Sequence, residues 1–291
     1  MARNKGSGVH ASRAILALAC VLGSACSSLS SSPAPLSPDI SNAPAPVPEL
    51  APGIPAGYLG HALPDSLALL PPPPAKGSTG FAHDQGVKRA AQRLRSTARY
   101  TLATKDADLH FPDVASTFAC ALGVPISQQQ TPHLYLLLQR SLVDAGLATY
   151  AAKNHYNRTR PFVFYKEATC FPSDEAQLRS DGSYPSGHTA IGWTWALLLT
   201  ELSPAQSTAL LARGRAFGES RLVCNAHWQS DVLQGRAIGA GALATLHANA
   251  DFRRDMELAR AEIQVLRGSG AEADGCAAEA EALAIAIPGV Q

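Results

Sequence analysis

A helical spacing of apolar residues runs through most of the chain beyond Pro74. The clearest stripe lies at about 133–153, where apolar residues recur every three or four positions: Leu134, Leu138, Leu142 and Ala145. Such a stripe is the buried face of an amphipathic helix. No alternating run is long enough to predict a convincing strand. The pattern therefore predicts an all-α fold, a single-domain compact helical bundle of about 200 residues, which is large enough to bury a core.

Start signals and periodicity predict the other helices. Ser203, Pro204 and Gln206 predict a helix that ends near Gly218, because Ser is a good N-cap and Pro suits the first helical position. The segment 189–202 is apolar on most sides and is expected at the centre of the fold. The remaining predicted helices cover 84–105, 112–122, 226–249 and 251–267, and an Ala/Glu-rich C-terminal tail (271–291) ends in a marginal helix.

Residues 1–26 have the composition of an export signal. Three positive residues precede an apolar stretch (14–22) that is too short to cross a membrane, and small residues follow it. Two outcomes remain open: cleavage after Ala25, or a lipoprotein in which Cys26 carries the lipid. Both predict a periplasmic or secreted protein, and the second adds a tether to the outer membrane.

Residues 27–56 are rich in Ser, Pro and Ala, which predicts an extended linker ahead of a folded domain at 57–270. The formal net charge of +1 gives no global reason to expect nucleic acid or an anionic membrane surface as a partner. Membrane contact is expected only through a lipid on Cys26. The sequence leaves the oligomeric state open, and a homo-oligomer is one option.

An even set of cysteines remains beyond Cys26: Cys120, Cys170, Cys224 and Cys276. In an oxidising compartment four cysteines can form two disulfides. Three pairings exist, and the sequence does not rank them.

Two basic residues precede a proline in the middle of the chain. Lys153 and Arg160 are seven positions apart, and Pro161 follows. Because Pro disfavours the α conformation in the residue before it, the helix that holds Lys153 is expected to end before Arg160. Taken alone, the segment is typical of a solvated, positively charged helix C-terminus.

His227 and Asp231 are four positions apart, a spacing that puts both on one face of a helix. An Asp that accepts from one imidazole nitrogen leaves the other as a nucleophile or base. A structural His–Asp pair or half of a metal site has the same spacing. Upstream, Ser220 and Arg221 close the preceding helix, and the guanidinium of Arg221 suits the oxygens of a phosphate.

The stretch Pro185-Ser186-Gly187-His188 precedes an apolar helix. At a helix N-terminus, Ser186 and Gly187 are expected to point backbone N–H groups, and Ser186 its hydroxyl, at one bound anion. Gly187 lets the backbone approach where a Cβ would intrude. His188 is then placed beside the anion with a proton to donate.

The three segments together supply three cations, a helix N-terminus and two histidines. A metal is the obvious rival ligand for two histidines and an aspartate, but Lys153, Arg160 and Arg221 repel a divalent cation. We therefore expect an oxyanion site with no metal and no cofactor.

The three segments resemble, in order, the signature of the phosphatidic acid phosphatase type 2 and vanadium haloperoxidase superfamily. The matching motifs are Lys153-x6-Arg160-Pro161, Pro185-Ser186-Gly187-His188 and Ser220-Arg221-x5-His227-x3-Asp231. The stretches "GSYPSGHT", "LPDSLALLPPPP", "RTRPFVFY" and "AHWQSDV" are similar to bacterial class A non-specific acid phosphatases. The resemblance covers roughly 58–267 and implies a helical bundle of the acid phosphatase and haloperoxidase type.

This resemblance implies a metal-independent acid phosphatase that hydrolyses small phosphomonoesters with broad specificity through a phosphohistidine. His227, oriented by Asp231, is the expected nucleophile, and His188 is the proton donor. The expected phosphate-binding residues are Lys153, Arg160, Ser186, Gly187 and Arg221. A rate optimum below neutrality is expected, because nearby cations depress the pKa of His188 while the acid must carry a proton.

Two alternatives are a vanadium-dependent haloperoxidase and a phosphate-binding protein without turnover. The class A stretches argue against the first, and the joint presence of His188, His227 and Asp231 argues against the second. The preferred phosphomonoester stays open. The segment 162–181 is expected to govern specificity.

Overall fold

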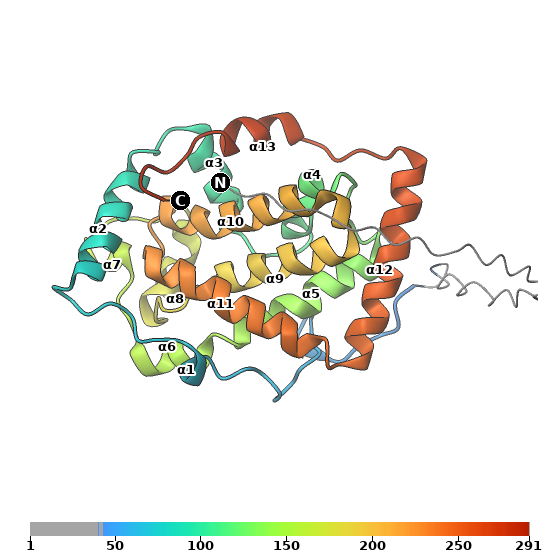
Figure 1. Ribbon diagram of the computed structural model, residues 1–291, viewed down its shortest axis with the longest axis horizontal. Helices are drawn as coiled ribbons and strands as arrows, with labels where there is room; N and C mark the ends of the chain where they lie inside the picture. The colour runs from blue at the N-terminus through green and yellow to red at the C-terminus, as the bar shows by residue number, and fades with distance from the viewer. Residues whose placement is uncertain (1–39, 41–42, 291) are drawn as a thin grey trace, which may run out of the picture. The chain divides into compact units, whose positions relative to one another are not determined.

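Helices predominate in the computed structural model, which describes residue 40 and residues 43–290 (Figure 1). The all-α fold class predicted from the sequence is confirmed. A hairpin of β1 (Glu49–Ala51) and β2 (Ile54–Pro55) lies inside the expected linker and was not predicted. The predicted export signal and Cys26 lie outside the described residues. Within the described part, no helix has the length and apolar character needed to cross a bilayer.

The central helix is α9 (Gly187–Leu202), as its apolar composition predicts. It packs against α10 (Ser207–Val223), α11 (Gln229–Leu246) and α5 (Pro132–Leu147) (Figure 1). The approach of α11 is close, since a Cβ on Gly235 would lie 2.7 Å from the carbonyl oxygen of Ser186. This contact places the first turns of α9 and α11 side by side, and the N–H of Ser186 donates to the carbonyl oxygen of Asp231 at 3.0 Å.

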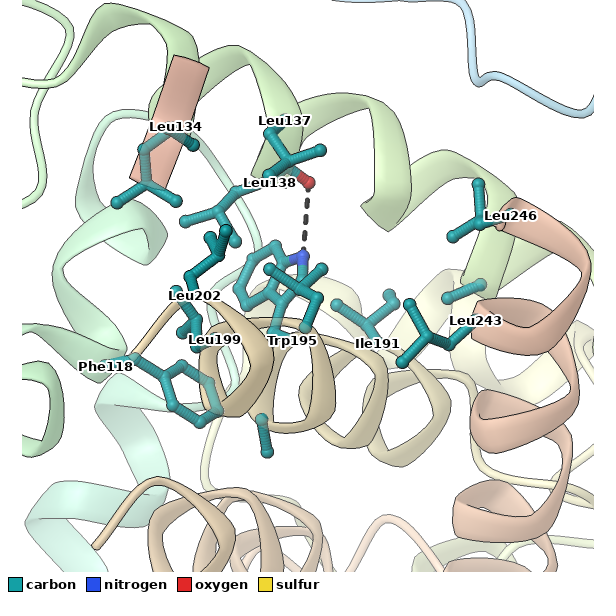
Figure 2. Packing of buried hydrophobic residues seen from close by; sticks show 14 of the residues in the cluster. Phe118, Leu134, Leu137, Leu138, Ile191, Trp195, Leu199, Leu202, Leu243 and Leu246 are labelled. Carbon is teal, nitrogen blue, oxygen red and sulfur yellow. Dashed lines mark hydrogen bonds between the residues drawn. The ribbon is translucent and has the colours of Figure 1, made fainter. Parts of the chain in front are cut away.

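Trp195 on α9 anchors the core between α9 and α5. Its side chain is fully buried, and its indole N–H donates to the carbonyl oxygen of Leu138 at 3.2 Å. Figure 2 shows three buried leucines of α5, Leu134, Leu137 and Leu138, in the same cluster as this ring. Each fully buried leucine contributes about 1.5–3 kcal/mol to folding, so the stripe read from the sequence holds α5 against the central helix.

Two predicted helices are interrupted. The predicted segment 84–105 forms α2 (Thr79–Gln92) and α3 (Ala98–Lys105), because the chain turns between them at Ser96, where φ is 67°. The predicted segment 133–153 forms α5 and α6 (Tyr150–Tyr156). Between these two helices the hydroxyl of Thr149 donates to the carbonyl oxygen of Gly146 at 2.7 Å, a local bond that competes with the helical pattern.

The other boundaries agree with the predictions to within a few residues. The start signal at Ser203 opens a short turn, η3 (Pro204–Gln206), and α10 then continues past the expected end near Gly218. The remaining helices are α1 (Ser66–Leu69), η1 (Asp113–Phe118), α4 (Ala119–Leu122), α7 (Pro161–Phe164), η2 (Pro172–Asp174), α8 (Glu175–Ser180), α12 (Ala250–Ser269) and α13 (Cys276–Leu283).

Two disulfides, Cys120–Cys276 and Cys170–Cys224, settle the pairing that the sequence left open. The first joins α13 in the C-terminal tail to α4, and Glu279 of the same helix pairs with Arg213 at 3.3 Å. The tail therefore packs on the helical domain. The second disulfide joins the segment 162–181 to the end of α10.

Candidate active site

The three predicted segments meet at the N-terminal end of α9. A cavity of about 240 Å³ lies there, lined by five of the predicted site residues: Lys153, Arg160, Gly187, His188 and His227. The other three, Ser186, Arg221 and Asp231, are buried beside these residues. A larger cavity of about 670 Å³ lies beside α13, but none of the eight predicted residues lines it. The smaller cavity is therefore the candidate site.

Lys153 and Arg160 lie side by side because they share Asp181 as a partner. Nζ of Lys153 is 3.4 Å and Nη2 of Arg160 is 3.0 Å from Oδ2 of Asp181. Lys153 also donates to the carbonyl oxygen of Gly182 at 2.6 Å. As predicted, the helix that holds Lys153 ends before Arg160, at Tyr156. Asp181 itself was not predicted as a site residue.

Arg221 is a buried cation on the last turns of α10. Burial, reinforced by the nearby Arg160, lowers the pKa of Arg221 to about 9 and that of Lys153 to about 8. Nε and Nη1 of Arg221 have no hydrogen-bond partner within the described part of the chain. A buried guanidinium with free donors is suited to an anionic ligand.

The tautomer of His227 follows from its two neighbours. Nη1 of Arg160 is 2.9 Å from Nε2 of His227. Because a guanidinium only donates, Nε2 accepts, and the ring proton of the neutral imidazole is on Nδ1. Burial, followed by the repulsion of Arg160 and Lys153, lowers the pKa of His227 well below its usual value. The ring is therefore neutral and has its lone pair on Nε2.

Asp231 lies behind His227, but the two residues do not share a helix face. The helix α11 begins at Gln229, so His227 precedes it and Asp231 lies in its first turn. The prediction was wrong because Oδ2 of Asp231 accepts from the N–H of Trp228 at 2.8 Å and caps the helix start. Nδ1 of His227 is nevertheless 3.4 Å from Oδ2 of Asp231, an ion-pair distance longer than a well-formed hydrogen bond.

Ser186 does not point its N–H group at the cavity, contrary to the prediction. That N–H donates to the carbonyl oxygen of Asp231, and the hydroxyl oxygen accepts from the N–H and hydroxyl of Thr189 at 3.2 and 2.9 Å. These bonds make Ser186 the N-cap of α9.

The backbone donors at this helix start belong to the next two residues. The N–H groups of Gly187 and His188 have no acceptor in the described part of the chain. A Cβ on Gly187 would meet nothing closer than Oγ1 of Thr149 at 3.8 Å, so protein packing alone does not require glycine there. The start of α9 can therefore donate to an anion in the cavity.

His188 is the second histidine of the cavity. Its Nε2 is 2.9 Å from the carbonyl oxygen of Ala107, which only accepts, so Nε2 carries a proton and Nδ1 is the atom that gains or loses the second one. Burial lowers the pKa of His188 well below its usual value, and Arg221 lowers it further. The predicted direction is confirmed, but burial, and not the cations, is the larger cause.

Two buried charged residues near Asp231 were not singled out from the sequence. Arg158 is 2.5 Å from Oδ1 of Asp231 through Nη1 and 2.7 Å from Oδ2 of Asp84 through Nη2. Arg158 belongs to the quoted stretch "RTRPFVFY", but Asp84 lies 74 residues earlier. No spacing in the sequence connects them.

The mouth of the cavity is formed in part by the segment 162–181. Asp174, Gln177 and Leu178, from η2 and α8, line the cavity together with Tyr150. The disulfide Cys170–Cys224 holds this segment against the end of α10. Its control of specificity stays a prediction.

Within residue 40 and residues 43–290, no group of three or more His, Cys, Asp or Glu side chains is arranged to hold a metal ion. The cavity wall carries Lys153 and Arg160 beside two carboxylates, Asp174 and Asp181, and Asp181 pairs with both cations. Arg221, buried close by with two donors unpaired in the described residues, adds a third positive charge. The charge of the cavity therefore favours an anion.

Comparisons with known proteins agree with this geometry. Residues 134–255 match the PAP2 superfamily, a range that includes all eight predicted site residues. The chain is 48% identical over 204 residues to a non-specific acid phosphatase of Providencia stuartii, which covers 70% of this chain and 82% of that protein. It is 47% identical over 205 residues to an acid phosphatase of Zymomonas mobilis, covering 70% and 78% of the two chains.

A non-specific acid phosphatase of Salmonella typhi is 40% identical over 200 residues, covering 68% of this chain and 80% of that protein. The fold and site define a protein of the PAP2 type. The chain belongs to the PAP2 superfamily and, within it, to the class A non-specific acid phosphatases.

Proposed function

We propose that this acid phosphatase hydrolyses small phosphomonoesters without a metal, through a phosphohistidine on Nε2 of His227. The observation that carries the proposal is the position of this ring. Its Nε2 accepts from Arg160 at 2.9 Å, its Nδ1 lies 3.4 Å from Asp231, and the ring lines a cavity with two cations on its wall.

In the first step, the substrate phosphoryl group enters the cavity. Lys153, Arg160, Arg221 and the N–H groups of Gly187 and His188 neutralise its non-bridging oxygens. Arg160 turns from Nε2 of His227 to a phosphate oxygen, and this frees the lone pair for attack. The bond from Nε2 to phosphorus forms, the bond from phosphorus to the ester oxygen breaks, and Nδ1 of His188 gives its proton to the leaving oxygen.

In the second step, water attacks the phosphohistidine. His188, now neutral, takes a proton from the water as the bond from phosphorus to Nε2 breaks. Inorganic phosphate leaves, and both histidines return to their starting states. Asp231 faces the Nδ1 proton of His227 and stabilises the positive charge that develops on the ring.

Two properties of the cavity support metal independence and broad specificity. The three cations supply the electrostatic stabilisation that a metal gives in other phosphatases. The cavity volume of about 240 Å³ lies below the range of about 300–1,000 Å³ that is usual for pockets enclosing a whole small molecule. The leaving group therefore stays near the mouth, where many alcohols fit.

The experiment is hydrolysis of p-nitrophenyl phosphate by the metal-free protein, with labelled substrate quenched in alkali to trap the adduct. We expect turnover below neutral pH and a phosphohistidine that maps to His227. Turnover with no adduct on any histidine contradicts the mechanism. Oxidation of halide by the vanadate-loaded protein with peroxide, in place of phosphatase turnover, identifies the haloperoxidase alternative.

We also propose that the enzyme is exported and acts in the periplasm or outside the cell, as residues 1–26 predict. Two disulfides in the described part of the chain suit an oxidising compartment. Attachment to a membrane through a lipid on Cys26 and assembly into a homo-oligomer are further proposals. Mass spectrometry of the mature N-terminus and light scattering test them.

A further inference from the structure

Arg158 and His227 contact different oxygens of the Asp231 carboxylate. Nη1 of Arg158 is 2.5 Å from Oδ1 of Asp231, whereas Oδ2 faces His227. The Arg158 side chain is 9% exposed and that of Asp231 is fully buried. Arg158 does not line the cavity. Among the groups that its side chain contacts, Asp231 is the one that faces His227, so the side chain acts on the reaction through Asp231.

Asp84 fixes the position of Arg158 from the other side. Nη2 of Arg158 is 2.7 Å from Oδ2 of Asp84, whose side chain is 1% exposed. The carboxylate of Asp84 also accepts from the N–H of Ser230 at 2.8 Å and from its hydroxyl at 2.6 Å. Because Ser230 precedes Asp231, this network joins α2 to the first turn of α11 and leaves the guanidinium little freedom.

One buried cation thus serves two buried carboxylates. Removing one member of such a set leaves an uncompensated charge in a medium of low dielectric constant. The other charged and titratable groups that act on Asp231 are Lys153, Arg160, Tyr184 and His227. Lys153 and Arg160 donate to Asp181 and Gly182, so Arg158 is the cation in direct contact with Asp231.

We propose that Arg158 is a positioning residue for the nucleophile: it orients the carboxylate of Asp231 towards Nδ1 of His227 and keeps that carboxylate ionised, with Asp84 holding Arg158 in place. The proposal rests on the assignment of His227 as nucleophile. A protonated or rotated Asp231 does not stabilise the charge on His227 during attack, so turnover falls.

The charges around Asp231 give the proposal a direction that can be measured. Burial raises the pKa of Asp231 to about 6, Arg158 opposes this rise, and Asp84 adds to it. Loss of Arg158 therefore raises the pKa of Asp231 further, and the acid limb of the rate profile moves to higher pH. Loss of the charge on Asp84 acts in the opposite direction.

The test compares kcat and KM for p-nitrophenyl phosphate across pH in Arg158→Gln, Arg158→Lys, Asp84→Asn and Ser230→Ala. In Arg158→Gln we expect kcat to fall by about 10- to 100-fold and the acid limb to rise by about one pH unit or more. KM should change little, because the cavity is intact. Arg158→Lys should restore part of both effects, and Asp84→Asn should move the acid limb down.

Ser230→Ala is the matched control, since it removes two hydrogen bonds of the same network without changing its charge: Nη1 of Arg158 donates to the Ser230 hydroxyl at 2.7 Å, and that hydroxyl donates to Asp84 at 2.6 Å. We expect its acid limb to stay in place. An acid limb that stays in place or moves to lower pH in Arg158→Gln overturns the proposal. If Arg158→Gln does not fold, Arg158→Lys is measured in its place, and an acid limb that does not rise in that variant overturns the proposal.

The wild-type adduct separates this proposal from the one it rests on. Absence of a phosphohistidine in the wild type overturns the mechanism and, with it, the role of Arg158. An adduct in the wild type together with an unshifted profile in Arg158→Gln overturns the role of Arg158 alone.

Discussion

Nδ1 of His227 lies 3.4 Å from Oδ2 of Asp231, although His227 is outside the helix that carries its partner. The same oxygen accepts from the N–H of Trp228 at 2.8 Å. The capping of α11 and the orientation of the imidazole therefore share one carboxylate. This arrangement ties the position of the proposed nucleophile to the start of a helix and not to a mobile loop.

His227→Ala should lower kcat by at least about a thousandfold, because the variant has no group to form the covalent intermediate. Alkaline quenching of labelled substrate should give no adduct, and circular dichroism should report an unchanged fold. His155→Ala is the control, since His155 is exposed on α6, the helix that holds Lys153. An adduct in His227→Ala contradicts the assignment of the nucleophile.

Binding of vanadate or inorganic phosphate should take up a proton near pH 6. In the free protein the pKa of His188 is well below its usual value of 6.5 because the ring is buried and Arg221 is near. A bound anion offsets the cations and raises that pKa, so His188 gains a proton. Calorimetry in two buffers of different ionisation enthalpy measures the uptake. His188→Asn should remove most of it, and an equal uptake in that variant contradicts the role of His188.

The contribution of His188 and His227 to the stability of the anion-free protein should fall as the pH drops below about 6.5, the usual pKa of histidine, against an opposite contribution from Asp231, whose pKa is raised to about 6. The pKa values of His188 and His227 are lowered in the folded state, so the unfolded state binds protons first and is favoured at acid pH. Each histidine contributes a slope of up to about 1.4 kcal/mol per pH unit. Urea denaturation at several pH values should give a flatter profile for His188→Asn. An identical profile in the variant goes against this account.

Removal of divalent metals with EDTA should leave turnover nearly unchanged, whereas vanadate should inhibit strongly. The cations Lys153, Arg160 and Arg221 supply the positive charge that the transition state requires. Vanadate takes up the trigonal-bipyramidal geometry of that state. Metal analysis of the EDTA-treated enzyme is the control. Strong inhibition by EDTA would indicate that turnover requires a bound metal.

The double variant Cys120→Ser/Cys276→Ser should lower the free energy of unfolding by about 3 kcal/mol while kcat stays close to the wild-type value. The disulfide closes a separation of 156 residues and holds α13, which does not contribute to the cavity. Chemical denaturation and turnover at the same temperature measure the two effects. A large loss of kcat in a folded variant would show that the C-terminal tail contributes to catalysis as well as to stability.

The sequence by itself determined the helical class, the central position of α9 and the three segments that supply the site. These features depend on local patterns: the apolar spacing of α5, the apolar surface of 189–202, and residue types held at fixed short spacings. Such patterns act within one or two helical turns, so they can be read without knowing where the chain folds back.

The tertiary structure alone decided which groups meet. It broke two predicted helices, paired the cysteines, directed the N–H of Ser186 to Asp231, and placed Arg158 between Asp84 and Asp231. Asp84 and Arg158 are 74 residues apart in the sequence, and they meet where α2 packs against the start of α11. Residues that meet only through tertiary packing have no fixed spacing in the sequence, because their contact depends on the fold of the whole domain.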